Sequence, residues 1–302
     1  MKKYLFNIVL FFLTIVIIDF CLGKAFDYMS IYAKGGEGKR MRDICVEDCH
    51  DVLIMGSSRA HHHYVTSLLS DSLGLDCYNA GYDGNGILLA YGMFKLLTEH
   101  YKPRMIIYDV EPVFDINVYP GDNNNTRYLS LQKPFFKNPS VAQIFKDVDE
   151  NEFYKVHSGM CRHNSTCITT LIDYLTVRSV DGDCGYIPLH GRMLKEPERE
   201  QGAGTAKSDM IKLRYLQRFI HETKSNDIKL IMVASPKYGS TKSSSFDIVK
   251  SYCKKANVPF LDYYTDSYFM SHKELFKESM HLNDDGARVF TNMMVKHIKE
   301  QL

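Results

Sequence analysis

Short apolar runs alternate with longer amphipathic stretches from residue 51 to the end of the chain. The apolar runs have the length of strands and cover residues 51–55, 75–79, 104–110, 229–235 and 259–264. Helical periodicity marks residues 60–73, 87–100, 208–223, 246–256 and 284–299. Strand-length runs separated by helices predict a parallel sheet that is covered on both faces. We therefore expect an α/β fold, a three-layer α/β/α sandwich with a five-stranded parallel sheet.

One long segment, residues 112–204, interrupts this alternation. It is rich in Asn, Tyr, Pro and Gly and shows no strand-length apolar run. An irregular segment of this length is too long for a plain connection inside a compact domain. We therefore interpret it as an insertion, within a domain of residues 24–302, that builds a lid or a wall of the substrate site.

The N-terminal residues follow a different pattern. Lys2 and Lys3 precede an apolar stretch, residues 4–22, which Asn7 and Asp19 interrupt. Its length is close to the ~20 residues that span a bilayer, and the two lysines predict a cytoplasmic N-terminus. We expect residues 1–23 to form an uncleaved transmembrane anchor, with the rest of the chain extracytoplasmic and periplasmic in a bacterium. A signal peptide cleaved near Cys21 and a buried core helix are the alternatives.

The charge and the cysteine content indicate which partners, disulfides and metals the chain is expected to have. The formal net charge is +1 and no basic block is present, which argues against a nucleic-acid partner. Seven of the eight cysteines lie beyond the anchor, and an exported chain tolerates disulfides. Cys45 and Cys49 form the bridge that we favour. The cysteine spacing is not typical of a zinc site, so we expect neither a metal nor another cofactor.

Two short motifs carry candidate chemistry. A Gly-Ser-Ser-Arg block at residues 56–59 places Ser58 where the first strand turns into a helix, and Glu278 stands three residues before His281, ahead of the last helix. A serine, a base and an orienting acid are the minimum set for acyl transfer. Ligands of parallel sheets bind beyond the carboxyl ends of the strands, where loop 81–86 also lies. We therefore expect Ser58, His281 and Glu278 to form one catalytic site.

These motifs resemble those of the SGNH (GDSL-like) hydrolase superfamily, and in particular its membrane-anchored acyltransferase- or esterase-like branches. That family has Gly-Asp-Ser after the first strand, Asn-x-x-x-x-Gly after the second and Asp-x-x-His before the last helix. Here Ser57 replaces the first aspartate, residues 79–84 match the second block, and Glu278 replaces the last aspartate. The resemblance extends over residues 51–302 except the insertion.

The resemblance implies a role for each matching residue. Ser58 is the expected nucleophile, His281 the base and Glu278 the acid that holds the imidazole. The backbone amides of Ser58 and Gly84 are the expected oxyanion hole. The family's further oxyanion asparagine is missing, because residues 109–113 read Asp-Val-Glu-Pro-Val. Asn85 or Asn117 are the candidates to replace it, and we expect Arg59 and Asn85 to contact substrate.

Other polar residues have plainer interpretations. His61, His62 and His63 are consecutive, so they point about 100° apart on a helix and three of them cannot share one metal. We interpret them as a solvated face or as a lining of the site's mouth. Arg59 could contact an anionic substrate, although its residue type and place on a helix favour an ordinary surface position. Asp109 and Glu111 at the end of the third strand fit either a supporting role or an ordinary loop.

Three functions remain from the sequence. The first is an esterase that hydrolyses O-acyl esters, with acetyl the expected acyl group, of a glycan or a small molecule. The second is an O-acyltransferase that uses the same serine to modify an envelope or exported polysaccharide. The third is a non-catalytic glycan-binding protein on the same fold, which the missing asparagine favours.

Overall fold

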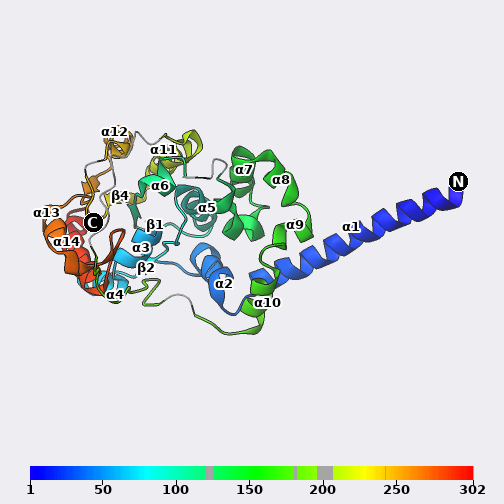
Figure 1. Cartoon of the computed structure of the whole chain (residues 1–302), viewed down its shortest axis with the longest axis horizontal. Helices are drawn as coiled ribbons and strands as arrows, with labels where there is room; N and C mark the ends of the chain where they lie inside the picture. Colours follow the sequence, from blue (N-terminus) through cyan, green and yellow to red (C-terminus); the bar gives the residue numbers. More distant parts are fainter. Residues whose placement is uncertain (120, 122–124, 180–181, 196–206, 242, 302) are drawn as a thin grey trace. The chain divides into compact units, whose positions relative to one another are not determined.

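Figure 1 shows the fold in a computed structural model that describes residues 1–119, 121, 125–179, 182–195, 207–241 and 243–301. The chain divides into two compact units. Unit 1 comprises residues 1–43 and 124–180, and unit 2 comprises residues 44–123 and 181–302. The candidate site residues all belong to unit 2.

Unit 2 contains the predicted sheet. Its strands are β1 (Val52–Gly56), β2 (Cys77–Asn79), β3 (Met105–Asp109), β4 (Lys229–Ala234) and β5 (Phe260–Asp262). They lie in the order β2-β1-β3-β4-β5 and all pair in parallel. Every residue of β1, β2 and β3 is buried. This is why these strands read as continuous apolar runs, since helices cover both faces of such a sheet.

Alternate strand residues face opposite layers of helices, which confirms the three-layer fold class. Val52 and Ile54 belong to one core with Phe290 of α14 (Asp284–Gln301), where α3 (Ser58–His63) and α4 (Thr66–Leu73) also pack. On the other face, the ring of Tyr108 lies 5.2 Å from that of Phe219 in α11 (Met210–Ser225). Helix α5 (Ile87–Leu97) packs beside α11.

The remaining elements of unit 2 are short or peripheral. They are the π-helix η1 (Asp43–Glu47, whose first residue belongs to unit 1), α6 (Pro112–Asp115), α12 (Ser245–Ala256), α13 (Ser267–Ser271), the 3-10 turn η3 (Lys273–Leu275) and the antiparallel pair β6 (Phe276–Glu278) and β7 (His281–Leu282).

The helix predicted at residues 60–73 is in fact two helices, α3 and α4, because Tyr64 and Val65 are extended. Both residues have partners that lie far away in the sequence. The Tyr64 hydroxyl donates to Asp109 Oδ2 at 2.6 Å, and the Val65 amide donates to Thr291 Oγ1 at 2.9 Å. The first bond fixes the Tyr64 side chain, and the second gives the Val65 amide an acceptor outside the helix.

Unit 1 is helical. Its elements are α1 (Lys2–Ile31), α2 (Gly36–Arg42), the 3-10 helix η2 (Thr126–Phe135), α7 (Pro139–Val148), α8 (Glu150–Lys155), α9 (Gly159–His163) and α10 (Cys167–Leu175). The expectation that residues 112–204 are irregular is therefore wrong for their middle part. Side chains of Asn138, Asp149 and Ser158 cap three of these short helices.

Helix α1 is long and apolar enough to cross a membrane, and its composition fits either an anchor or a signal sequence. Its N-terminal part extends away from the other helices of unit 1 (Figure 1). Its C-terminal part packs on α9. The Asp19 carboxylate accepts from Ser158 Oγ at 2.7 Å and from the amides of Gly159 and Met160 at 3.0 and 2.8 Å. The aspartate that interrupts the apolar stretch thus caps α9.

All eight cysteines lie among the described residues, and all are free thiols. The predicted Cys45–Cys49 bridge is therefore wrong. Cys45 is fully buried in η1 and Cys49 is exposed. Burial raises the pKa of the Cys45 thiol far above its ordinary value.

Candidate active site

The turn between β1 and α3 places the predicted nucleophile. Gly56 ends β1 with φ 140°, in the region that favours glycine. A Cβ at this position would lie only 2.5 Å from the carbonyl oxygen of Asp109 on the neighbouring strand. Ser57 is extended, and α3 begins at Ser58. Ser58 therefore stands just beyond the carboxyl end of β1, at the start of a helix.

The structure brings Ser58, His281 and Glu278 together in a chain of hydrogen bonds. His281 Nε2 lies 2.7 Å from Ser58 Oγ, and His281 Nδ1 contacts the Glu278 carboxylate. A carboxylate only accepts, so Nδ1 carries the proton and Nε2 is free to accept from the serine hydroxyl. Partial burial alone would raise the pKa of Glu278, but hydrogen bonds from His281 and the Met280 amide hold that pKa below its ordinary value.

The two amides expected to form an oxyanion hole have no acceptor among the described residues. Neither the Ser58 N–H nor the Gly84 N–H makes a hydrogen bond there. Gly84 has φ 66°, which a glycine adopts without strain. The Asn85 side chain donates to the carbonyl of Asp83 at 2.9 Å, which is a bond within its own loop.

The expectation that Arg59 contacts substrate is wrong, because its side chain is fully buried. Its Nε forms an ion pair with Glu111 at 2.8 Å, and Nη2 lies 3.5 Å from Asp109. Its Nη2 also donates to the Val110 carbonyl at 2.7 Å. Arg59 therefore ties α3 to the end of β3. Burial raises the pKa of Asp109 despite the opposite effects of Arg59, Ser235 and Tyr64.

His63 belongs to a second chain of hydrogen bonds, which is fully buried. The Leu282 amide donates to His63 Nε2 at 3.0 Å, so the proton of the neutral ring is on Nδ1. Nδ1 lies 2.9 Å from Ser235 Oγ, and the Ser235 side chain bonds to Asp109. Burial, together with the nearby His281, Arg59 and His62, holds the pKa of His63 well below its ordinary value. The residue thus connects the helix of the serine with the strand of His281.

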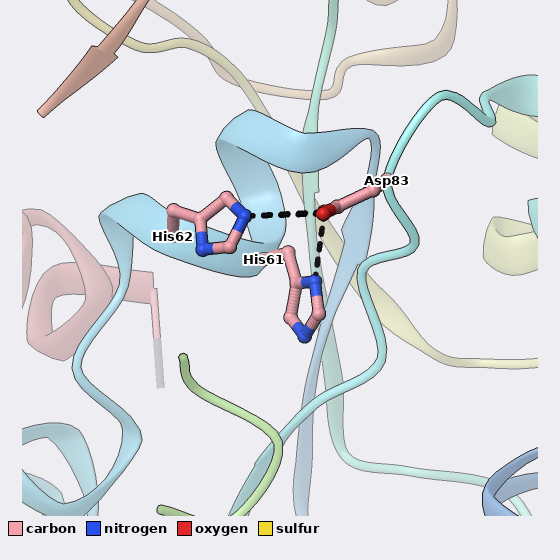
Figure 2. A group of neighbouring side chains, drawn as sticks. All are labelled: His61, His62 and Asp83. Carbon is pink, nitrogen blue, oxygen red and sulfur yellow. Dashed lines mark hydrogen bonds and ion pairs between the residues drawn. The ribbon is translucent and has the colours of Figure 1, made fainter. Parts of the chain in front are cut away.

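His61 and His62 are also buried, so the prediction of a solvated face is wrong for the histidine run. Their rings stack at 4.8 Å, and both turn toward Asp83 (Figure 2). Partial burial would raise the pKa of Asp83, but hydrogen bonds from His61 and His62 hold it far below its ordinary value. The His62 ring lies 5.7 Å from that of His281, which places this group beside the candidate active site.

Asn79 fixes the loop that carries Asp83 and Gly84. Its side-chain nitrogen donates to the carbonyls of Ala60 and Tyr64 at 2.7 and 3.3 Å, and its oxygen accepts from the Gly81 amide at 3.0 Å. Asn79 is fully buried at the end of β2. Asn79 therefore attaches the loop after β2 to the backbone of α3 at Ala60 and to the residue that follows this helix, Tyr64.

Part of the predicted insertion lies at the site as well. The carbonyl of Ile187 is 2.7 Å from His62 Nδ1, and the Tyr186 hydroxyl donates to Asp284 at 2.8 Å. The carbonyl of Gly191 accepts from the Asn283 side chain at 3.0 Å. The segment 182–195 therefore runs along α3 and the start of α14.

The chain is similar to solved structures of an esterase and of two proteins assigned to the GDSL family. The crystal structure of an acetyl xylan esterase, AlAXEase, is 12% identical with a TM-score of 0.40, over 82% of this chain and 99% of that one. A protein assigned to the lipolytic G-D-S-L family, from Desulfitobacterium hafniense, is 11% identical with a TM-score of 0.40, over 82% and 98%. One assigned as a GDSL-like lipase, from Parabacteroides merdae, is 9% identical with a TM-score of 0.40, over 81% and 93%.

No family model and no curated protein matches the sequence. The identities of 9–12% to these structures are too low to transfer a function, so the geometry of the site has to indicate it.

Proposed function

We propose that this chain is a membrane-anchored, extracytoplasmic serine esterase that hydrolyses O-acyl esters, chiefly O-acetyl esters, of a glycan or a small molecule. The observation that supports the proposal is the hydrogen-bonded sequence of Ser58 Oγ, His281 and the Glu278 carboxylate. A serine whose hydroxyl donates to a histidine, which in turn donates to a carboxylate, is an activated nucleophile. A serine with a purely structural role would not require a histidine that is itself held by a carboxylate.

The reaction follows from these contacts. Ser58 Oγ attacks the carbonyl carbon of the ester while its proton passes to His281 Nε2. The oxyanion that forms accepts from the amides of Ser58 and Gly84. When the carbon–oxygen bond to the alcohol breaks, His281 returns the proton to the leaving oxygen and the acyl group stays on Ser58. Water then attacks the acyl-serine through the same base, which releases the acid and restores the hydroxyl of Ser58.

The contacts of α1 support an anchor rather than a removed signal. Gly23 is buried against α9, where an added Cβ would lie 2.6 Å from the Cα of Gly159. Asp19 caps α9, and Asp27 accepts from Arg162 Nε and Nη2 at 2.9 Å each. Cleavage near residue 23 would remove part of the packing of unit 1. The mature protein should therefore retain residues 1–23. Intact mass measurement of the purified protein tests this expectation.

Labelling with a fluorophosphonate tests the proposed nucleophile. The full-length protein in detergent should gain one adduct, located on the peptide that contains Ser58. Ser58→Ala should gain none, and His281→Ala should react about 10²–10⁴-fold more slowly, as expected for loss of a general base. Ser57→Ala is the matched control, because Ser57 is the adjacent serine and has no part in the mechanism.

Adduct formation that persists in Ser58→Ala, or that is lost equally in Ser57→Ala, would refute the assignment. Turnover of an acetyl ester with and without a sugar acceptor then measures hydrolysis against transfer. Free acetate is the expected product. Acetylated sugar in excess of acetate would replace the esterase with an acyltransferase that uses the same serine.

A further inference from the structure

Three side chains next to the active site form a group with the composition of a metal site. Ligand atoms of His61, His62 and Asp83 lie within 4.8 Å of one another. His61 Nδ1 is 2.9 Å from Asp83 Oδ1, and His62 Nε2 is 3.2 Å from the same oxygen. Figure 2 shows both imidazoles, from α3, turned toward the carboxylate, which comes from the loop after β2.

The contact on the other side of His62 defines what its Nε2 can do. His62 Nδ1 lies 2.7 Å from the carbonyl oxygen of Ile187, which only accepts. Nδ1 therefore carries a proton, and in the neutral ring Nε2 presents a lone pair. This lone pair faces the oxygens of the Asp83 carboxylate. Two acceptors in contact require a cation between them, which is either a second proton on the ring or a metal ion.

The same carbonyl contact is what metal-binding histidines usually make. A ligating imidazole donates its other ring N–H to a carbonyl or carboxylate, which fixes the tautomer and the orientation of the ring. Ligands of one tetrahedral zinc ion, at bond lengths of about 2.0–2.1 Å, are about 3.3–3.4 Å apart. Two of the separations here, 2.9 and 3.2 Å, are close to that value. The group therefore needs only a small shift to close around an ion.

We propose that His61, His62 and Asp83 bind one divalent first-row transition ion, with zinc as the representative ion. Two imidazoles and one carboxylate suit such ions better than magnesium or calcium, which prefer oxygen ligands. The side chain of Asp83 is 60% exposed, whereas those of His61 and His62 are 7% and 8% exposed. The ion would therefore be held on its protein side by buried rings and would keep an open position toward solvent. This proposal differs from the expectation, from the sequence, that the site holds no metal.

An ion in this place would also act on the oxyanion hole, a consequence that rests on the proposed function. Asp83 immediately precedes Gly84, whose amide is one of the two proposed donors. Binding would hold the Asp83 carboxylate against α3, the helix that begins with Ser58. Zinc should therefore increase the rate of fluorophosphonate labelling by ordering the loop, at a distance from the reacting atoms.

Zinc binding by the full-length protein in detergent tests the proposal at pH 7.5. After treatment with EDTA and desalting, the protein is titrated with zinc against a chelating dye. Exposed cysteines also bind zinc, so the quantity measured is the difference between variants. The protein should bind one zinc ion more than Asp83→Asn and one more than His62→Gln. Because Asp83 is exposed, its replacement should leave the fold intact.

His50→Gln is the matched control. His50 Nδ1 lies 2.7 Å from Asp76 in another histidine–aspartate pair of unit 2. A pair without a third ligand should not hold the ion, so this variant should retain the full zinc number. Cobalt gives a second measurement, because its visible absorption reports nitrogen and oxygen ligands. These bands should disappear in Asp83→Asn and remain in His50→Gln.

Equal zinc numbers for the unsubstituted protein and Asp83→Asn would overturn the metal site and assign the contact to a protonated His62. The labelling assay separates this result from the proposed function. Labelling of Ser58 without zinc binding would overturn the metal site alone. Zinc binding without labelling would support the metal site and refute the esterase. Zinc binding that leaves the labelling rate unchanged would overturn only the effect on the loop.

Discussion

Replacement of His63 by phenylalanine should reveal how much the buried hydrogen bonds beneath the active site stabilise unit 2. His63 is fully buried, accepts from the Leu282 amide at 3.0 Å and contacts Ser235 Oγ at 2.9 Å. A phenyl ring fills the same space and makes neither bond. The Leu282 amide is then left buried without an acceptor, which costs about 1–3 kcal/mol. Ser235 loses one partner and keeps Asp109.

The pH dependence gives the prediction its sign. The folded protein keeps His63 neutral, because burial and the nearby His281, Arg59 and His62 hold its pKa well below the ordinary value. The unfolded chain protonates this residue below about pH 6.5. The unfolded state therefore binds more protons in this range, and the stability of the folded state falls as pH is lowered. The loss contributed by His63 is at most about 1.4 kcal/mol per pH unit, and the phenylalanine variant should lack it.

Unfolding of unit 2 can be measured separately from unit 1. Cys253 belongs to unit 2 and is 1% exposed, so its alkylation in a short pulse at fixed pH reports the unfolded fraction. The full-length protein in detergent is equilibrated in urea between pH 5.5 and 7.5 before each pulse. The difference in stability between the unsubstituted protein and His63→Phe should be largest at pH 7.5 and shrink toward pH 5.5.

His100→Gln is the control, because His100 is an exposed residue of the same unit. Its stability should follow that of the unsubstituted protein at every pH. A constant difference between His63→Phe and the unsubstituted protein across the range would refute the reasoning, since it would mean that His63 is not held neutral by the fold.

Three further predictions concern the acid, the buried ion pair and the thiols. Glu278→Gln should lower kcat for acetyl-ester hydrolysis by about 10²–10⁴-fold, because an amide can hold the wrong tautomer of the base; an unchanged kcat would show that the acid is dispensable. Arg59→Met should destabilise unit 2 by about 3–5 kcal/mol in the urea assay, since it leaves two buried carboxylates unpaired; a loss below 1 kcal/mol would contradict this. Iodoacetamide should modify Cys49 and leave Cys45 intact in the native protein, as read by peptide mass, whereas protection of both would indicate a bridge.

The sheet could be predicted from sequence because of how its strands are buried. In β1 and β3 every residue is buried on one face or the other, so apolar residues run continuously and mark the strands directly. The break between α3 and α4 could not be predicted in the same way. The helical periodicity continues through Tyr64, and the break depends on bonds to Asp109 and Thr291, which are 45 and 226 residues away.

Polar residues show the same limit at the site. Ser58 and His281 could be named because the spacing around each is typical of a nucleophile and a base. The sequence predicts Arg59 at the surface or against substrate, and His63 on a solvated face or at the mouth of the site, because charged and polar residues are mostly exposed. Their burial depends on distant partners, of which Ser235 is 176 residues from Arg59 and Leu282 is 219 residues from His63.

The sequence of the helical part of unit 1 contains capping residues that indicate helices, although its average composition is polar. The polar character of residues 124–180 suggested an irregular segment. Nevertheless, Asn138 before Pro139 is a typical helix start, and the structure confirms it with bonds from the amides of Ser140 and Val141 to the Asn138 side chain. Local capping residues thus predict short helices better than the average polarity of a segment does.

Helix α3 explains why these observations belong together. It has six residues, too few to be stable by itself, so its position depends on what its side chains contact. Arg59 attaches it to the end of β3, His63 to β7, and His61 and His62 to the loop after β2. The hydroxyl of its first residue, Ser58, lies 2.7 Å from His281 Nε2. The buried polar residues after Ser58 therefore hold α3 in place, and a change in any of them should move Ser58 relative to His281.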